Sequence, residues 1–155
     1  MSSLFHLAFP VDNLNAAKTF YVDGLGCLLG RSSAHSLILN FMGNQLVAQL
    51  TNEEIAPQKS IYPRHFGLIF STMEEWQQIL RRCQDKRLKF RIEPKHRHPG
   101  EITEHHTFFI EDPANNLLEF KYYLHEIAIF GALESSQIGD WDELTGSSLL
   151  GPINE

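Results

Sequence analysis

The sequence HFGLIF at residues 65–70 is similar to FHLAF at residues 5–9. Both stretches are short, apolar and rich in aromatic residues, which predicts β-strands at residues 65–70 and 4–11. A histidine stands at the start of each expected strand, His65 in the later stretch and His6 in the earlier one. Elsewhere the two halves of the chain share little sequence, so the repeat is one of structural order. Such a repeat predicts two similar modules packed about a pseudo-two-fold axis.

The same order of elements is expected in both halves. Apolar residues at three- and four-residue spacing predict a helix after each of the two similar strands, at residues 14–23 and 73–85. Three more strands are expected after each helix. They lie at residues 27–32, 36–42 and 45–50 with a turn at Gly43-Asn44, and at residues 90–93, 106–111 and 117–123 with a turn at residues 112–116. The sequence therefore predicts an α+β protein of two βαβββ modules, residues 1–56 and 60–125, that form a cupped mixed β-sheet half-barrel.

The composition is that of an ordinary globular protein. The chain has 155 residues, of which 43% are hydrophobic, and no apolar run approaches the roughly 20 residues that span a bilayer. The net charge is −6, and the one basic concentration, at residues 81–91, is expected to be a solvated face or a site for a carboxylate-bearing ligand. The N-terminus lacks the pattern of a signal peptide. We therefore expect a soluble, cytoplasmic protein that binds neither nucleic acid nor membranes, with Cys27 and Cys83 as reduced core residues.

Four polar residues occupy matching places in the two expected modules. His6 and His65 begin the first strands, whereas Gln49 and Glu119 lie in the last strands. The first and last strands of each module are expected to meet in the cup, which would point all four side chains at one centre. Glu119 has apolar neighbours, and a carboxylate is costly to bury without a partner. A divalent cation held by His6, His65 and Glu119 would remove that cost.

The ligand set indicates which metals to expect. Two neutral imidazoles and one carboxylate suit non-haem Fe(II) and leave coordination positions open, although Zn, Mn, Ni or Co could also bind. Each residue taken alone has a simpler explanation. A single histidine near a strand start is more often a hydrogen-bonded structural group, and Glu119 could lie on an edge strand or pair with Lys121. The three residues together, at matched positions, favour the metal site.

Two further histidines are candidates for proton transfer. His105 and His106 are adjacent on one expected strand, so their side chains point to opposite faces and only one can face the cup. That one is a candidate general acid or base, because histidine titrates near neutral pH. The other histidines lie in turns or polar stretches and are expected at the surface: His35, His96, His98 and His125.

At these residues the chain resembles the vicinal oxygen chelate superfamily, which includes glyoxalase I, fosfomycin- and bleomycin-resistance proteins and type I extradiol dioxygenases. The resemblance covers residues 4–123. The resemblance rests on FHLAFPV at residues 5–11, FY at residues 20–21 with GLGC at residues 24–27, HFG at residues 65–67 and the stretch from EDP to EFK at residues 111–121. GRS at residues 30–32 and GNQLVAQL at residues 43–50 add likeness to a group of predicted extradiol-type dioxygenases. The resemblance implies the glyoxalase/bleomycin resistance/dihydroxybiphenyl dioxygenase fold.

The resemblance also implies a metal-dependent dioxygenase of the extradiol type. Fe(II) would chelate two neighbouring oxygens of a small catechol-like or vicinal-oxygen substrate and bind dioxygen at a third position. Lys121 is favoured as a partner for a substrate carboxylate, because it shares the strand face of Glu119 by period two. The candidates for proton transfer are His105, His106 and Tyr62, and those for substrate binding are Arg31, Gln49 and Lys121.

Two other functions stay open. Glyoxalase I proteins usually place a fourth, acidic ligand at the position of Gln49, so its absence favours the dioxygenase over a glyoxalase-like isomerase or lyase. The short chain favours the isomerase instead, because the well-known ring-cleaving enzymes are mostly longer. A third possible function is that of a non-catalytic antibiotic- or metabolite-binding protein, which would need no metal.

Residues 126–155 lie outside both modules and are expected to form a C-terminal extension. The sequence does not decide how this extension is placed. A homodimer is the expected assembly, since dimers are common for chains of this type. The modules could pair within one chain or between two chains.

Overall fold

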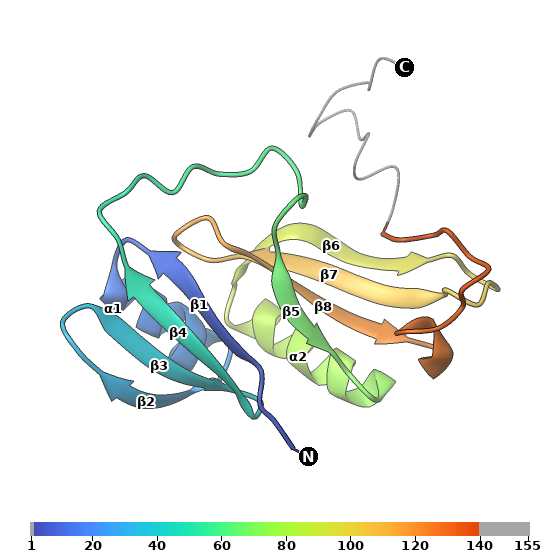
Figure 1. Ribbon diagram of the computed structural model, residues 1–155, viewed down its shortest axis with the longest axis horizontal. Coiled ribbons are helices and arrows are strands. Elements are labelled where there is room, and N and C mark those ends of the chain that lie inside the picture. Colours follow the sequence, from blue (N-terminus) through green and yellow to red (C-terminus); the bar gives the residue numbers. More distant parts are fainter. Residues whose placement is uncertain (1, 140–155) are drawn as a thin grey trace. The chain divides into compact units, whose positions relative to one another are not determined.

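The computed structural model describes residues 2–139, which contain two four-stranded β-sheets and few helices (Figure 1). The chain divides into two compact units. The first comprises the chain up to Pro57 together with Arg81–Lys89 and Glu111–Asn116. The second comprises Gln58–Leu80, Phe90–Ile110 and the chain from Leu117 onwards. Each unit is built around one of the two sheets.

The first unit contains the first βαβββ module. Its sheet has the order β1-β4-β3-β2, in which β1 and β4 are parallel and the other pairs are antiparallel. The side chain of Asn13 caps the first helix by accepting a hydrogen bond of 2.9 Å from the backbone N–H of Ala16. The elements are β1 His6–Val11, α1 Leu14–Lys18, the π-helix η1 Thr19–Gly24, β2 Leu28–Ser32, β3 Ser36–Phe41 and β4 Asn44–Leu50.

Tyr21 is the largest side chain in the core of the first unit, where it is fully buried. The rings of Phe9 and Phe20 pack against it at centroid distances of 5.1 and 4.8 Å. Its hydroxyl donates a hydrogen bond of 2.7 Å to Asp112, in the turn between the last two strands of the second module. Burial, followed by the charge of Asp112, raises the pKa of Tyr21 well above its usual value. The hydroxyl therefore stays protonated and serves as a donor.

The second unit contains the strands of the second module in the order β5-β8-β7-β6, with β5 parallel to β8. Trp76 fixes the long helix on one face of this sheet. Its ring packs against Phe108 at a centroid distance of 5.6 Å, and its indole N–H donates to the carbonyl oxygen of Phe120 at 2.9 Å. From β5 onwards the elements are β5 Phe66–Ile69, α2 Met73–Asp85, β6 Lys89–Arg97, β7 His105–Glu111, β8 Leu117–Tyr123 and the 3₁₀-helix η2 Glu126–Ala128. The end of α2 from Arg81, together with Lys89 and Glu111, belongs to the first unit.

The predicted α+β class and the repeated order of elements are confirmed, but three local predictions are wrong. The helix expected at residues 14–23 is α-helical only to Lys18 and continues as a π-helix. The turn between β3 and β4 is Met42-Gly43, because both residues have positive φ, 49° and 90°, as a two-residue hairpin turn requires. Strand β6 runs to Arg97, and Pro94 is tolerated within it because β6 lies at the edge of the sheet.

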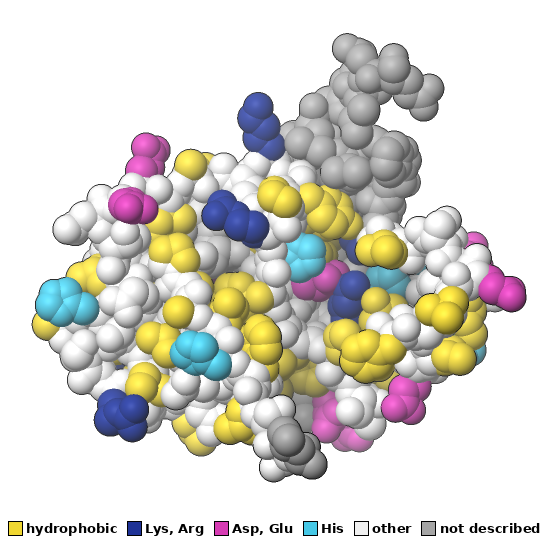
Figure 2. Space-filling view, viewed as in Figure 1, with side chains coloured by type: hydrophobic (Ala, Val, Ile, Leu, Met, Phe, Trp, Pro, Cys, Tyr) yellow, Lys and Arg dark blue, Asp and Glu magenta, His cyan; other side chains and the backbone are white. Residues whose placement is uncertain are grey.

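Other predictions concern single side chains. Both cysteines are buried free thiols, as expected. The basic stretch at residues 81–91 is more than a solvated face, because Arg82 donates to the carbonyl of Gly24 at 2.7 Å and Arg91 donates to that of Lys59 at 2.9 Å. On the face shown in Figure 2, Lys and Arg side chains are scattered among acidic and hydrophobic ones.

The C-terminal extension is described only in part, because its residues 140–155 lie outside the described residues. Its described part begins with η2 and continues to Gly139. Within residues 2–139, no helix is long and apolar enough to cross a membrane.

Candidate metal centre

His65 lies immediately before β5, and its ring is held in one orientation. Its Nδ1–H donates a hydrogen bond of 2.8 Å to the carbonyl oxygen of Ile61. The other ring nitrogen, Nε2, lies 3.3 Å from Oε1 of Glu119 and carries the lone pair whenever the imidazole is neutral. A backbone carbonyl on one imidazole nitrogen is the usual means of orienting a histidine that binds metal through the other.

Glu119 is buried on β8, with 6% of its surface exposed. Its Oε2 accepts a hydrogen bond of 2.7 Å from the hydroxyl of Thr107, and Nζ of Lys121 lies 3.4 Å from its Oε1. Burial favours the neutral acid, but the hydrogen bond from His65 and the charge of Lys121 outweigh it and lower the pKa of Glu119. Burial likewise disfavours protonation of His65, yet Glu119 and the Ile61 carbonyl raise the pKa of His65. The carboxylate and the imidazole thus favour a positive charge between them, which is the place where a cation would sit.

The two strands that carry this pair approach each other closely. Gly67 on β5 is opposite Glu119 on β8 in the parallel register. A Cβ atom at Gly67 would overlap the backbone carbonyl of Glu119, so only glycine fits there. The glycine of the HFG stretch therefore sets the strand spacing on which the contact between His65 and Glu119 depends.

His6, the third predicted ligand, belongs to the first unit, where it begins β1 with an exposed side chain. Its Nδ1–H donates a hydrogen bond of 2.7 Å to Oε1 of Gln45, its neighbour in the β1–β4 register. Its Nε2 is thereby left for coordination, as in His65. Among the described residues, no three His, Cys, Asp or Glu side chains lie close enough together to hold a metal ion. Within the second unit, the structure brings together two of the predicted ligands, His65 and Glu119.

The strand registers change the expected symmetry of the site. Opposite Glu119 stands Gly67, two residues after His65, and opposite Val47 stands Ala8, two residues after His6. The first-module counterpart of Glu119 is therefore Val47 and not Gln49, which instead corresponds to Lys121. An apolar side chain thus stands where a fourth, acidic ligand would be expected.

Gln49 and Arg31, two of the predicted substrate-binding residues, both lie in the first unit. The side-chain amide of Gln49 donates a hydrogen bond of 3.2 Å to the carbonyl oxygen of His35. Arg31 lies on β2, the edge strand, with its side chain exposed.

The two adjacent histidines of β7 point to opposite faces, as predicted. His105 shares the face of Thr107, the residue that hydrogen-bonds Glu119. His106 packs on the other face, where its ring stacks on His96 at a centroid distance of 4.3 Å and lies 5.5 Å from Trp76 of α2. His105 is therefore the histidine of this strand that can act beside Glu119.

His105 is 3% exposed and held as a neutral imidazole. Its Nδ1–H donates a hydrogen bond of 2.8 Å to the carbonyl oxygen of Thr103, which leaves the lone pair on Nε2. Burial, with the nearby positive charges of Lys121 and Arg97, lowers its pKa to about 4 despite the hydrogen bond to Thr103. Its ring lies 5.1 Å from that of Tyr123.

Tyr62 and Lys121 are also near the pair. The ring of Tyr62 lies 6.0 Å from that of His65. Nζ of Lys121 donates to the hydroxyl of Tyr123 at 3.2 Å and contacts Glu119, which confirms that Lys121 shares the face of Glu119. In the second unit the structure thus gathers three further predicted residues on the side of the sheet that carries the pair: Tyr62, His105 and Lys121.

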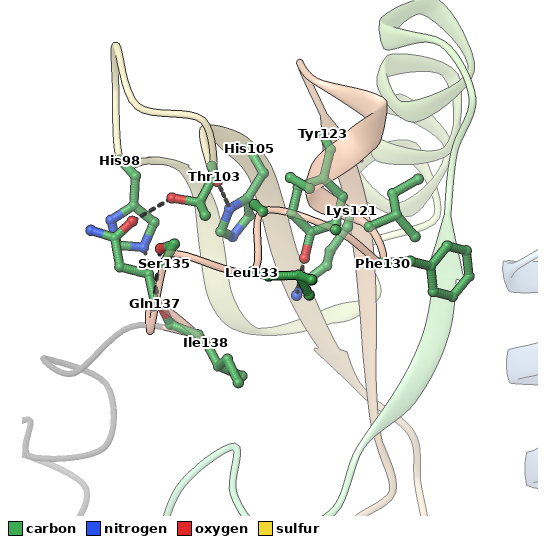
Figure 3. A pocket seen from close by; sticks show the side chains of 15 residues that line it. His98, Thr103, His105, Lys121, Tyr123, Phe130, Leu133, Ser135, Gln137 and Ile138 are labelled. Carbon is green, nitrogen blue, oxygen red and sulfur yellow. Dashed lines mark hydrogen bonds between the residues drawn. The ribbon is translucent and has the colours of Figure 1, made fainter.

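Sequence reasoning missed three residues and a segment here. Thr107 and Tyr123 could have been found, because period two along β7 and β8 places them on the face of His105 and Glu119. His98 was assigned to the surface, yet it is half-buried and donates from Nε2 to the carbonyl oxygen of Gly139 at 3.2 Å. The segment Ala128–Gly139, which lines a cavity beside Lys121, carries no sequence signal of this role (Figure 3).

Comparisons with known proteins agree with this fold. The family model described as Glyoxalase/Bleomycin resistance protein/Dioxygenase superfamily matches residues 3–120. A crystal structure of a glyoxalase/bleomycin resistance protein/dioxygenase from Alicyclobacillus acidocaldarius is 39% identical, with 83% of this chain and 96% of that chain covered and a TM-score of 0.78. No curated protein matches the chain.

Two more distant structures share the fold alone. The fosfomycin resistance protein FosX from Listeria monocytogenes is 18% identical, with 83% of this chain and 98% of that chain covered and a TM-score of 0.63. The lactoylglutathione lyase from Agrobacterium tumefaciens is 21% identical, with 79% of this chain and 94% of that chain covered and a TM-score of 0.60. The fold is thus that of the vicinal oxygen chelate proteins. The chain belongs to the glyoxalase/bleomycin resistance/dioxygenase superfamily.

Proposed function

We propose that the protein is a metal-dependent enzyme, a dioxygenase of the extradiol type that acts on a small substrate with two neighbouring oxygens. The observation that carries this proposal is the distance of 3.3 Å between Nε2 of His65 and the buried carboxylate of Glu119. The Ile61 carbonyl orients the imidazole, and Thr107 orients the carboxylate, which are the supports a metal ligand pair needs. The residues therefore fit a divalent metal.

The third ligand in this proposal is His6. Its Nδ1–H is engaged by Gln45, so its Nε2 is the nitrogen free to coordinate. Two histidines and one carboxylate form the facial set that Fe(II) oxygenases use, and they leave positions open for other ligands. Val47, at the place of a fourth acidic ligand, supports a three-ligand site.

The chain's own groups supply binding and proton transfer. The metal, when bound, supplies a Lewis acid for the two substrate oxygens and, if it is Fe(II), the redox chemistry that dioxygen requires. Lys121 offers a positive charge for an anionic group of the substrate. His105 offers a neutral Nε2 that can accept a substrate proton, and Tyr62 lies beside His65 as a second candidate for proton transfer.

A glyoxalase-like isomerase or lyase is the second candidate. The observation that favours it is His105, because a buried imidazole with a free lone pair suits the removal of a proton next to a metal-polarised carbonyl. Zn, Mn, Ni or Co would serve that reaction as well as iron, since it needs no redox chemistry.

The test is elemental analysis of protein purified without chelators, for the wild type, Glu119→Ala and the matched control Glu104→Ala. Glu104 is also in the second unit but pairs with His96. About one iron per chain, lost only in Glu119→Ala, supports the dioxygenase and leads to oxygen-uptake assays with catechols. Zn, Ni, Mn or Co would favour the isomerase. Absence of metal from all three proteins would overturn the proposal and favour a binding protein.

The expected homodimer offers a way to learn which chain supplies His6. His6→Ala and His65→Ala protein would be purified separately without metal and then mixed and refolded together. Mixed dimers regain metal if one site takes its two histidines from different chains. They stay metal-free if each site is built within one chain.

A further inference from the structure

A cavity of about 420 Å³ adjoins the candidate metal centre within the second unit (Figure 3). His105 of β7 and Lys121 and Tyr123 of β8 line it from the sheet, and the segment Ala128–Gly139 lines it from outside the sheet. Nζ of Lys121 also contacts Glu119, so the cavity begins beside the proposed metal ligand. Its volume suits a small organic molecule.

His105, which lines this cavity, carries an unsatisfied acceptor. Because Nδ1–H donates to the carbonyl of Thr103, Nε2 carries the lone pair. This nitrogen is buried and has no hydrogen-bond partner among the described residues. A buried polar atom without a partner is costly, so the site favours a ligand that donates a hydrogen bond, such as one with a hydroxyl group.

Lys121 and Tyr123 present donors. The ammonium group of Lys121 has three N–H bonds, and its described partners are Glu119 Oε1 at 3.4 Å and the Tyr123 hydroxyl oxygen at 3.2 Å. One N–H therefore remains for a ligand. Because the Tyr123 oxygen accepts from Lys121, its own hydrogen can be donated as well. Two donors, one of them charged, suit the oxygens of a carboxylate.

The segment Ala128–Gly139 supplies an apolar wall. Leu133 and Ile138 line the cavity, yet they are 91% and 95% exposed, so a ligand could cover apolar surface that the chain leaves open. The hydroxyl of Thr103 donates to the side chain of Gln137, which ties the wall to the sheet. The family match ends at residue 120, so this wall lies outside the match.

We propose that the cavity binds a small hydroxy acid with an apolar body. The carboxylate meets Lys121 and Tyr123, the hydroxyl donates to Nε2 of His105, and an aromatic or branched group covers Leu133 and Ile138. The proposal rests on the proposed function, because it makes the cavity the part of the same site that selects the substrate.

The test uses the full chain treated with a chelator, so that binding does not depend on a metal. Binding is measured by titration calorimetry with 3-phenyllactate and with three truncated probes. The probe 3-phenylpropanoate lacks the hydroxyl, 2-phenylethanol lacks the carboxylate, and lactate lacks the ring. We expect 3-phenyllactate to bind at least about tenfold more tightly than each truncated probe, since each lost contact is worth about that factor.

Variants locate the binding. We expect Lys121→Met and His105→Leu each to weaken 3-phenyllactate binding roughly tenfold and Leu133→Ser roughly threefold. The control Leu28→Ser changes another exposed leucine, on β2 in the first unit, and should leave binding unchanged. The proposal is overturned if 3-phenyllactate does not bind, if 3-phenylpropanoate binds equally well, or if Leu133→Ser has no more effect than Leu28→Ser.

The metal content of the same untreated preparations separates the two proposals. Metal in the wild type without 3-phenyllactate binding in the treated protein overturns the substrate class alone. Selective 3-phenyllactate binding in a protein that takes up no metal supports the cavity and overturns the metal-dependent function.

Discussion

Glu119 takes its partners from alternate positions on neighbouring strands. Thr107 on β7 donates to one carboxylate oxygen, and Lys121 on β8 lies beside the other. Tyr123 follows Lys121 by the same period and extends the polar row to the cavity. A period-two pattern therefore places the proposed ligand Glu119, its supporting hydroxyl and the ammonium group of Lys121 on one face.

The hydroxyl of Thr107 can be removed with little change of shape. In Thr107→Val the buried carboxylate of Glu119 loses a donor, so we expect the free energy of unfolding to fall by about 1–3 kcal/mol. Metal affinity should fall roughly 10–100-fold, as for other groups that orient a ligand. Urea unfolding and metal titration measure the two effects, with Thr19→Val, an exposed threonine of η1, as the control. Unchanged metal affinity in Thr107→Val would argue against Glu119 as a ligand.

The lowered pKa of His105 predicts how the stability of the protein depends on pH. Its pKa is lowered from 6.5 to about 4 in the folded chain, so between these values the unfolded chain binds more protons than the folded one. Stability should therefore fall as pH drops from 6.5 towards 4, by on the order of 3 kcal/mol from this residue. The check is urea unfolding across this range for the wild type and His105→Leu, with the imidazole titrated by NMR. An equal pH slope in both proteins would refute the assignment.

The sequence predicted the site only in part. His65 and Glu119 were found because a histidine opens each module and a carboxylate stands in an apolar strand. Gln49 was wrongly matched with Glu119, because sequence spacing does not reveal how strands are paired. Val47 and Gln49 are two residues apart and lie on the same face of β4, so only the strand register shows that Val47 is the counterpart of Glu119. The unsatisfied Nε2 of His105 could not be predicted, since it depends on the carbonyl of Thr103.

At the scale of elements, the prediction succeeded where apolar periodicity is strong. The helix α2 and the strand β8 have the predicted bounds, Met73–Asp85 and Leu117–Tyr123. The prediction failed where polar residues form part of a strand, as in the second half of β6. It also failed in η1, where the helical hydrogen-bond pattern changes from α to π although the spacing of apolar residues does not change. The order of strands in the sheets determines which residues can meet at the site. It was predicted from the repeated order of elements and not from any single element.

The pairing of β5 with β8 can be tested at Gly67. A Cβ atom there would meet the backbone of Glu119, which cannot move aside as a flexible side chain could. We expect Gly67→Ala to lower the free energy of unfolding by about 3 kcal/mol or more and to abolish metal binding.

A matched glycine serves as the control for this change. In Gly30→Ala, on the edge strand β2, the nearest side-chain atom to the new Cβ is Cγ2 of Ile38 at 3.2 Å. A small loss of stability and normal metal binding are expected there. Similar losses of stability in both variants would show that the close approach of β5 to β8 is not special.

At the scale of the whole molecule, the chain combines a part that the family model matches with a C-terminal segment that lies outside the match. The family match covers residues 3–120 and so contains all three proposed ligands. The cavity wall Ala128–Gly139 lies beyond it. We therefore expect metal binding and substrate selection to be separable by truncation.

Two truncated proteins test this separation. A chain that ends at His125 loses the wall, and its exposed Leu133 and Ile138 contribute little to the core, so the free energy of unfolding should change by less than about 1 kcal/mol. It should keep metal but bind 3-phenyllactate at least about tenfold more weakly, because the apolar contacts are lost. A chain that ends at Gly139 keeps the wall and should bind both normally. Metal loss in the shorter chain would contradict the separation, because it would make the extension part of the metal site itself.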